Sequence, residues 1–333
     1  MATYYDIFGQ KVQYLSSDPP ATYITEGQVW YNSPSRVGKV QGYANAAWTT
    51  GGNIGRTMSS GGMTTQGTKD AFLVWNGAQP GADTNPGYTV SYNGTSWTNL
   101  PNTPYDATTP GSFGTQTAAV GAGGNDGGGG KTNTIEYDGS SWSAGGSLSA
   151  IRTYMYNGAG TINDGIIIAG WGGPSNVQIN DVIYYNGTSW STEPASCPFP
   201  SYTGTHYGST HNSVNYLGGY NPVKNDHVNY NGTSFTTLTD YPLDVAGSSS
   251  AGTTSEGYVW NGYNGPPGAT AVGNDWNGSS WTTGITFPAA NQNSFSGGSS
   301  VGVALNCQGQ NPYTPATHEF TAAGAETQTI TTS

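Results

Sequence analysis

The chain has 333 residues, of which 34% are hydrophobic and only 8% are charged, and its formal net charge is −11. Lysines and arginines number only eight in total, so the chain lacks the basic surface needed to bind nucleic acid or an anionic membrane. No run of about 18 apolar residues is present, so we expect no insertion into a membrane.

Residues 1–47 stand apart from the rest of the chain because the repeated pattern described below does not include them. The opening MATYYDIFGQKVQYL lacks the basic and apolar stretches of a secretory leader, so we expect synthesis without a signal peptide. Two short strand patterns follow, QVWYN at 28–32 and KVQGY at 39–43.

A six-residue pattern then recurs along the chain. It reads YNGTSW at 92–97, YDGSSW at 137–142, YNGTSW at 185–190, YNGTSF at 230–235 and WNGSSW at 276–281. The last aromatic of the pattern recurs every 45 to 49 residues, at Trp48, Trp97, Trp142, Trp190, Phe235 and Trp281. A fixed period in this range indicates a repeat architecture.

Each repeat predicts about four short strands and no helix. Asn-Gly and Asp-Gly are the strongest short hairpin signals, because a type I′ turn needs positive φ at both central residues. An apolar run such as GIIIAGW at 165–171 is too short for a helix and ends in glycines. The complete modules span about 54–97, 98–142, 143–190, 191–235, 236–281 and 282–333, of which the last is degenerate.

Four antiparallel strands in each of six modules predict an all-β fold, a β-propeller over residues 48–333. AAWTT at 46–50 is a lone outer strand that would complete the last blade, giving the six blades that we favour. In the alternative, QVWYN, KVQGY and AAWTT form most of a seventh blade with the C-terminal TQTITTS.

The module resembles the kelch propeller repeat, in which a Gly-Gly pair ends the second strand, a Tyr lies in the third and a Trp opens the fourth. The paired glycines are Gly123-Gly124, Gly172-Gly173 and Gly218-Gly219, and the tyrosines are Tyr137, Tyr185 and Tyr230. Two modules depart from the pattern, with VWNG at 74–77 and 259–262. The resemblance implies a fold and no particular activity.

The segment EGQVWYNSPSRVGKVQGYANAAWTTGGN at 26–53 looks like a short segment of structural and fibre proteins in tailed bacteriophages, where it precedes YNGTSW-type repeats in marine phages. The resemblance implies a virion protein of the tail fibre or tail, made in the host cytoplasm. Residues 1–47 lie outside the repeat, so we predict that they attach the protein to other virion proteins. Assembly into a homo-oligomer is left open.

No catalytic residue, metal or cofactor is expected. His206 and His211 are five residues apart, so in one strand they would point to opposite faces. Of the six aspartates considered as catalytic carboxylates, Asp70, Asp83, Asp126, Asp164, Asp226 and Asp275, most adjoin Gly or Asn and fit turns better than acid–base catalysis. GGNDGGGGK at 123–131 lacks phosphate-loop spacing and has one carboxylate where calcium needs several. We favour unpaired thiols for Cys197 and Cys307.

The loops between the second and third strands would share one face of the ring with the connections between modules. The loops between the second and third strands vary most from module to module, which is typical of a binding surface on a rigid support. Four of them carry an aromatic residue, namely Trp171, Tyr220, Tyr263 and Tyr313. Aromatic rings and amides suit sugars, so we predict adhesion to host-surface polysaccharide. The alternatives are a decoration protein of capsid or tail and a glycan-degrading depolymerase.

Overall fold

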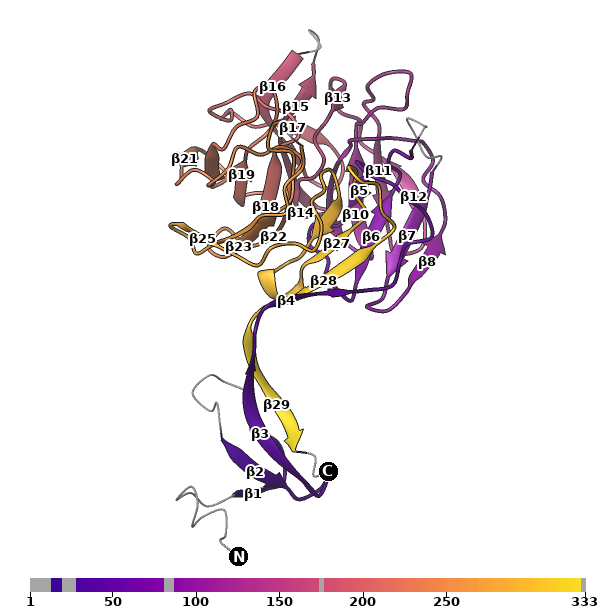
Figure 1. The fold of residues 1–333 in the computed structure, drawn as a ribbon. Coiled ribbons are helices and arrows are strands. Elements are labelled where there is room, and N and C mark those ends of the chain that lie inside the picture. Colours follow the sequence, from indigo (N-terminus) through magenta and orange to yellow (C-terminus); the bar gives the residue numbers. More distant parts are fainter. Residues whose placement is uncertain (1–12, 20–27, 81–86, 174–176, 267, 331–333) are drawn as a thin grey trace, which may run out of the picture. The chain divides into compact units, whose positions relative to one another are not determined.

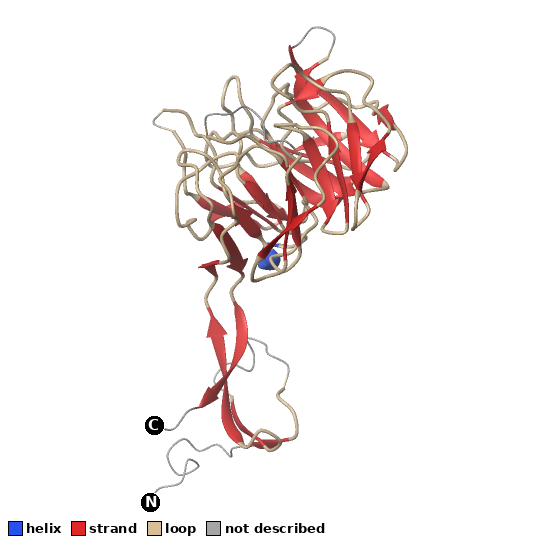
Figure 2. Ribbon diagram, turned by 90° about the vertical axis from the view of Figure 1, so that its right-hand side faces the viewer, coloured by secondary structure: helices blue, strands red, loops and turns tan. Residues whose placement is uncertain are grey.

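The computed structural model describes residues 13–19, 28–80, 87–173, 177–266 and 268–330 (Figure 1). The chain divides into two units: a larger one, Trp48–Thr321, and a smaller one made by the two ends of the chain. Strands dominate the described residues, and one 3-10 turn, Val301–Val303, interrupts them (Figure 2). No helix in the described part of the chain is long and apolar enough to cross a membrane.

The larger unit contains six sheets of four or five strands, which confirms an all-β fold built from repeated sheets and is consistent with a β-propeller. The first two sheets are β5 (Gly62–Met63), β6 (Phe72–Trp75), β7 (Thr89–Tyr92), β8 (Trp97–Leu100), and β9 (Gly111–Thr115), β10 (Ala118–Ala122), β11 (Thr134–Tyr137), β12 (Trp142–Gly145). The third and fourth are β13 (Arg152–Thr153), β14 (Ala159–Thr161), β15 (Asp164–Gly172), β16 (Val177–Tyr185), β17 (Trp190–Thr192), and β18 (Thr205–Thr210), β19 (Ser213–Leu217), β20 (His227–Tyr230), β21 (Phe235–Thr237). The fifth and sixth are β22 (Ser249–Gly252), β23 (Gly257–Trp260), β24 (Gly273–Trp276), β25 (Trp281–Thr283), and β26 (Phe295–Gly297), β27 (Leu305–Cys307), β28 (Thr317–Thr321), β4 (Ala47–Thr50).

The inner strands of these sheets contact one another in a closed cycle. Contacts run from β5 to β9, β14, β18, β22 and β26, and from β26 back to β5. The sixth sheet joins the two ends of the unit, because β4 from its N-terminal end lies beside β28. AAWTT therefore completes the last sheet, as the favoured interpretation of the sequence expected.

A belt of backbone hydrogen bonds follows the same cycle. One residue shortly before each inner strand has φ between 54° and 59°: Ser60, Thr109, Tyr154, Thr203, Gly247 and Asn293. The backbone amide at this position donates to the backbone carbonyl at the same position of the preceding module, at 2.5 to 3.3 Å. In the third module the donor is the amide of Met155 and not that of its neighbour Tyr154. The left-handed conformation is unusual for Thr109 and Thr203 because their side chains are β-branched. The closed belt supplies the restraint that holds them there.

The recurring aromatic of the sequence pattern links each sheet to the one before it. The indole N–H of Trp142 donates to the Thr89 hydroxyl at 3.0 Å, and that of Trp190 donates to the Thr134 hydroxyl at 2.9 Å. Trp97 makes the same bond to Thr317 at 2.9 Å and so ties the first sheet to the last. These bonds explain why the chain repeats the aromatic at a fixed spacing.

The other three recurring aromatics, Trp48, Phe235 and Trp281, also pack towards the preceding sheet. Trp48 lies 5.2 Å from Trp260 in the fifth sheet, between ring centroids, and Trp281 lies 5.2 Å from His227 in the fourth. Phe235 packs against an apolar cluster shared by the third and fourth sheets, where it fills space without an N–H to donate.

Each second strand ends in a residue with left-handed φ followed by a glycine with φ above 90°. The pairs are Asn76-Gly77, Gly123-Gly124, Ala169-Gly170, Gly218-Gly219, Asn261-Gly262 and Gln308-Gly309. The VWNG modules thus keep the geometry, because Asn tolerates this region better than most residues. In the third module the pair is Ala169-Gly170 instead of the expected Gly172-Gly173, since β15 continues past a bulge to Gly172.

The smaller unit is a single four-stranded sheet in the order β1 (Gln13–Leu15), β2 (Val29–Asn32), β3 (Val37–Ala44) and β29 (Gly324–Ile330). β1 pairs with β2 in parallel, and β29 pairs in antiparallel register with β3, from Gly324 beside Ala44 to Ile330 beside Gly38. Residues 324–330, which the sequence-based boundary assigned to the propeller, therefore belong to this unit. The reason is that β4 already occupies the outer position of the last sheet.

A candidate binding cup on the loop face

The larger unit has two chemically different faces. Because the strands of each sheet alternate in direction, the Asn-Gly turns between third and fourth strands lie on one face, here called the turn face. The loops between second and third strands and the connections between sheets lie on the other, here called the loop face. The candidate site is on the loop face.

Two adjoining cavities form a cup there, with volumes of about 380 and 620 Å³. Tyr154, Tyr156 and Asn293 line both. Tyr154 and Asn293 belong to the backbone belt, so the cup lies where the inner ends of the modules meet. The belt fixes the backbone beneath the cup, which makes the site preformed.

The smaller cavity is aromatic. Tyr202 lies at the centre of an arc, with ring centroids 5.5 Å from Tyr154, 5.5 Å from Tyr220 and 5.3 Å from Trp171. Tyr220 continues the arc to Tyr263 at 5.8 Å. Tyr154 and Tyr220 remain 38% and 39% exposed, so their rings are accessible to a ligand.

The four aromatic residues predicted from sequence are only partly brought together. Tyr220 and Tyr263 line the aromatic cavity, while Tyr313 lines the larger, polar one. Trp171 packs edge-on against Tyr202 and lines neither cavity. It therefore supports the arc instead of facing the cup.

Sequence reasoning missed three tyrosines of the cup, Tyr154, Tyr156 and Tyr202. They lie in connections between sheets, whereas the sequence-based prediction placed the binding aromatics on the loops between second and third strands. A signal was available, because YMY at 154–156 and Tyr202 lie within a few residues of the same belt position in consecutive modules, before the inner strand.

The larger cavity is lined by hydroxyls and amides. Gln310 accepts hydrogen bonds from Ser59 at 3.2 Å and from Tyr313 at 3.5 Å, which fixes its orientation. The hydroxyls of Thr109 and Thr203, on residues only 4% and 8% exposed, have no partner among the described residues. Each lines one cavity of the cup. A buried hydroxyl without a partner is costly, so a ligand hydroxyl that reaches either one would gain a hydrogen bond.

The described lining of the cup consists of Tyr, Ser, Thr, Asn, Gln, Ala and Gly, and so carries no formal charge. Burial raises the pKa of Tyr156 and of Tyr202, so both phenols stay protonated at neutral pH. Each can then both donate and accept a hydrogen bond.

The histidines considered as metal ligands have other roles. His206 is buried, accepts from the Ile168 amide at 3.0 Å through Nε2 and faces Asn157 through Nδ1 at 2.9 Å. Burial lowers the pKa of His206 to about 3, so the ring is neutral. His211 pairs with Asp164 instead. Among the described residues, no three His, Cys, Asp or Glu side chains gather as metal ligands would.

Two further predictions concern the cysteines and the glycine-rich loop at 123–131. Cys197 and Cys307 are both free and buried, as favoured from the sequence. In the glycine-rich loop, Asp126 forms an ion pair with Lys131 at 2.5 Å, which occupies its one carboxylate.

No protein-family model and no curated protein matches this chain.

Proposed function

We propose that Trp48–Thr321 is a six-bladed, kelch-like propeller whose cup binds an uncharged glycan on the surface of a host cell. The closed cycle of six inner strands and the interlocking aromatics support the blade number. In this proposal the protein is a virion component of a tailed phage and acts in adhesion, without catalysis.

The observation that carries the proposal is the pairing of accessible tyrosine rings with unpartnered hydroxyls in one preformed cup. The C–H faces of a sugar pack on aromatic rings, and its hydroxyls need partners that both donate and accept. Tyr154, Tyr220 and Tyr263 offer rings, and Thr109 and Thr203 offer such hydroxyls.

The charge distribution supports an uncharged glycan in particular. A net charge of −11 repels polysaccharides rich in uronic acid, sulfate or phosphate. The described lining of the cup contains no cation that would offset this repulsion. Binding through the cup should therefore depend little on salt concentration.

Attachment to other virion proteins is assigned to the smaller unit. The sequence suggested residues 1–47, and the pairing of β29 with β3 extends the candidate to both ends of the chain. A deletion of 1–47 alone would remove the partner of β29, so the attachment test should remove Gly324–Ile330 as well.

The test measures binding of the purified protein to host cells and to their extracted surface polysaccharide. We expect saturable binding by the unmodified protein and at least a tenfold loss of affinity in the double variant Tyr220→Ala with Tyr263→Ala. Tyr14→Ala is the matched control, because Tyr14 is 76% exposed and belongs to the smaller unit.

Three results would contradict the proposal in different ways. Equal binding by the double variant would remove the cup as the site, and no binding by any form would favour a decoration role. Sugar released from the polysaccharide would identify a depolymerase.

A further inference from the structure

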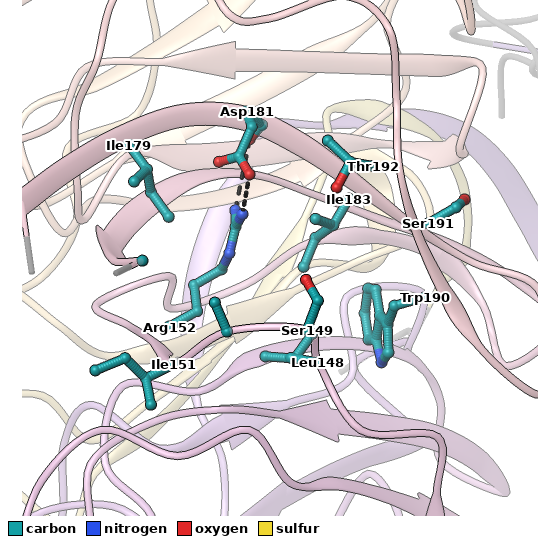
Figure 3. Close-up of a pocket in the computed structure, with 12 residues that line it drawn as sticks. Leu148, Ser149, Ile151, Arg152, Ile179, Asp181, Ile183, Trp190, Ser191 and Thr192 are labelled. Atoms are coloured by element: carbon teal, nitrogen blue, oxygen red, sulfur yellow. Dashed lines mark hydrogen bonds and ion pairs between the residues drawn. The ribbon is translucent and has the colours of Figure 1, made fainter. Parts of the chain in front are cut away.

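A separate pocket of about 360 Å³ lies at the outer side of the third sheet (Figure 3). It forms between the segment that enters this sheet and the outer strands β16 and β17. Leu148, Ile151, Ile179 and Ile183 give it apolar walls, and Trp190 lies at one end. We call it the rim pocket, and it shares no lining residue with the cup.

The rim pocket contains an ion pair between a buried arginine and an aspartate whose side chain is 38% exposed. The Arg152 guanidinium, on a residue only 6% exposed, extends across the pocket and donates to Asp181 Oδ2 at 2.7 Å. It also donates to the Ala169 carbonyl at 3.0 Å. Ser201 and Asn291, which occupy the position of Arg152 in their own modules, donate to the corresponding carbonyls of Gly218 and Gln308.

The repeat shows that this charge is not needed for the fold. Only the third module has an arginine at this position, where the others have Met58, Ala107, Ser201, Val245 and Asn291. The position of Asp181 is filled in the other modules by Tyr88, Asn133, Asp226, Val272 and Ala316. A neutral donor or an apolar side chain therefore suffices at the arginine position elsewhere, although burial of the Arg152 guanidinium carries a desolvation cost.

One oxygen of the ion pair lacks a hydrogen-bond partner among the described residues. Asp181 Oδ1 is buried and has no hydrogen-bond partner in the part of the chain that the structure describes. A buried carboxylate oxygen of this kind needs a donor. Ser149, Ser191 and Thr192 line the same pocket and provide further hydroxyls.

We infer that the rim pocket binds a single sugar residue as a second glycan subsite, independent of the cup. A hydroxyl of the sugar donates to Asp181 Oδ1, and the Arg152–Asp181 pair stays intact and neutral overall. The apolar face of the sugar packs against Ile151, Ile183 and Trp190. Neighbouring sugar hydroxyls exchange hydrogen bonds with the serine and threonine side chains of the pocket.

The inference is tested on the full chain by saturation-transfer NMR. The probes are the methyl glycosides of glucose, galactose, mannose, fucose and rhamnose, followed by the extracted host polysaccharide. Asp181→Asn is expected to weaken binding of at least one glycoside tenfold or more. The cup variant Tyr220→Ala with Tyr263→Ala is expected to leave that binding unchanged, which separates this subsite from the proposed function.

The repeat provides the control. Asp226→Asn changes the equivalent position in the fourth sheet and should leave glycoside binding as it is. If Asp181→Asn does not fold, Ser149→Phe fills the pocket from an exposed position without touching the ion pair. The inference is overturned if no glycoside binds the unmodified protein, or if a folded pocket variant binds as well as the unmodified protein.

Discussion

The turn face and the loop face of the larger unit are built from the same strands but obey different rules. On the turn face, the Asn or Asp side chain of each of the five YNGTSW-type turns accepts two backbone N–H bonds, at 3.0 and 2.9 Å for Asn93 and at 3.0 and 2.9 Å for Asn231. On the loop face the connections differ in length and sequence, and they hold the cup.

The difference separates contacts that every module must make from loops that each module can vary. Interactions that join one sheet to the next recur because each sheet must meet its neighbour in the same way, so Trp97, Trp142 and Trp190 all bond to the same threonine position. The loop face carries no such requirement above the backbone belt, so its side chains are free to form a site.

The largest expected effect is on the joint between the first and last sheets. Trp97→Ala should lower the free energy of unfolding by about 3–5 kcal/mol, because it removes a partly buried indole and its bond to Thr317. Urea unfolding followed by circular dichroism measures it. Trp97→Phe should cost only about 1 kcal/mol, the value of a hydrogen bond, as Phe235 is the natural residue in the fourth sheet. A Trp97→Ala variant as stable as the unmodified protein would show that this joint does not hold the ring closed.

Acid should lower the free energy of unfolding, because His206 is buried as a neutral ring. The pKa of His206 is about 3 in the folded protein and near 6.5 when unfolded, so the unfolded chain binds the proton more tightly. This contribution to stability is complete above pH 6.5 and is lost as the pH falls from 6.5 towards 3, by up to about 1.4 kcal/mol per pH unit. Unfolding measured between pH 7 and pH 4 tests this.

His227 adds to the same trend, because burial lowers its pKa to about 4. His206→Gln should therefore flatten the pH dependence without abolishing it. A His206→Gln variant with the same slope as the unmodified protein would contradict the assignment of a neutral, buried His206.

A smaller effect is expected on the turn face. Asn186→Ala should cost about 1 kcal/mol, because the side chain accepts from the amides of Thr188 and Ser189 at 2.9 Å each. Thermal unfolding measures the change. Since the turns are alike, Asn231→Ala should cost nearly the same, and a large difference between the two would show that the turn face is not equivalent from module to module.

The smallest effect on stability is expected in the cup. Tyr220→Ala should change the free energy of unfolding by less than about 0.5 kcal/mol, because Tyr220 is 39% exposed on the loop face. The same variant should lose glycan affinity. Loss of stability comparable to that of Trp97→Ala would mean that the arc of tyrosines serves the fold and not a ligand.

The sequence by itself determined the local and periodic features of this protein. Asn-Gly and Asp-Gly mark the turns in the sequence, but the expected type I′ geometry is wrong, because φ is positive at the glycine and not at the residue before it. Pairing of Tyr92 with Trp97 leaves a four-residue loop, in which the Asn93 side chain accepts from backbone amides. An aromatic every 45 to 49 residues marks one sheet after another. Turns, strands and the place of Trp48 in the last sheet could therefore be predicted, since each follows from residues close together or from the repeat.

Only the tertiary structure decided which residues meet at a distance. β29 pairs with β3 because the outer position of the last sheet was already filled. The seventh-blade alternative grouped TQTITTS with QVWYN and KVQGY but added AAWTT to them, and the structure places AAWTT in the last sheet instead. Tyr154 and Tyr202 meet in the cup because closure of the ring brings the ends of different modules together. The Arg152–Asp181 pair likewise joins residues from separate strands, and no periodic pattern contains it, because it occurs in one module alone.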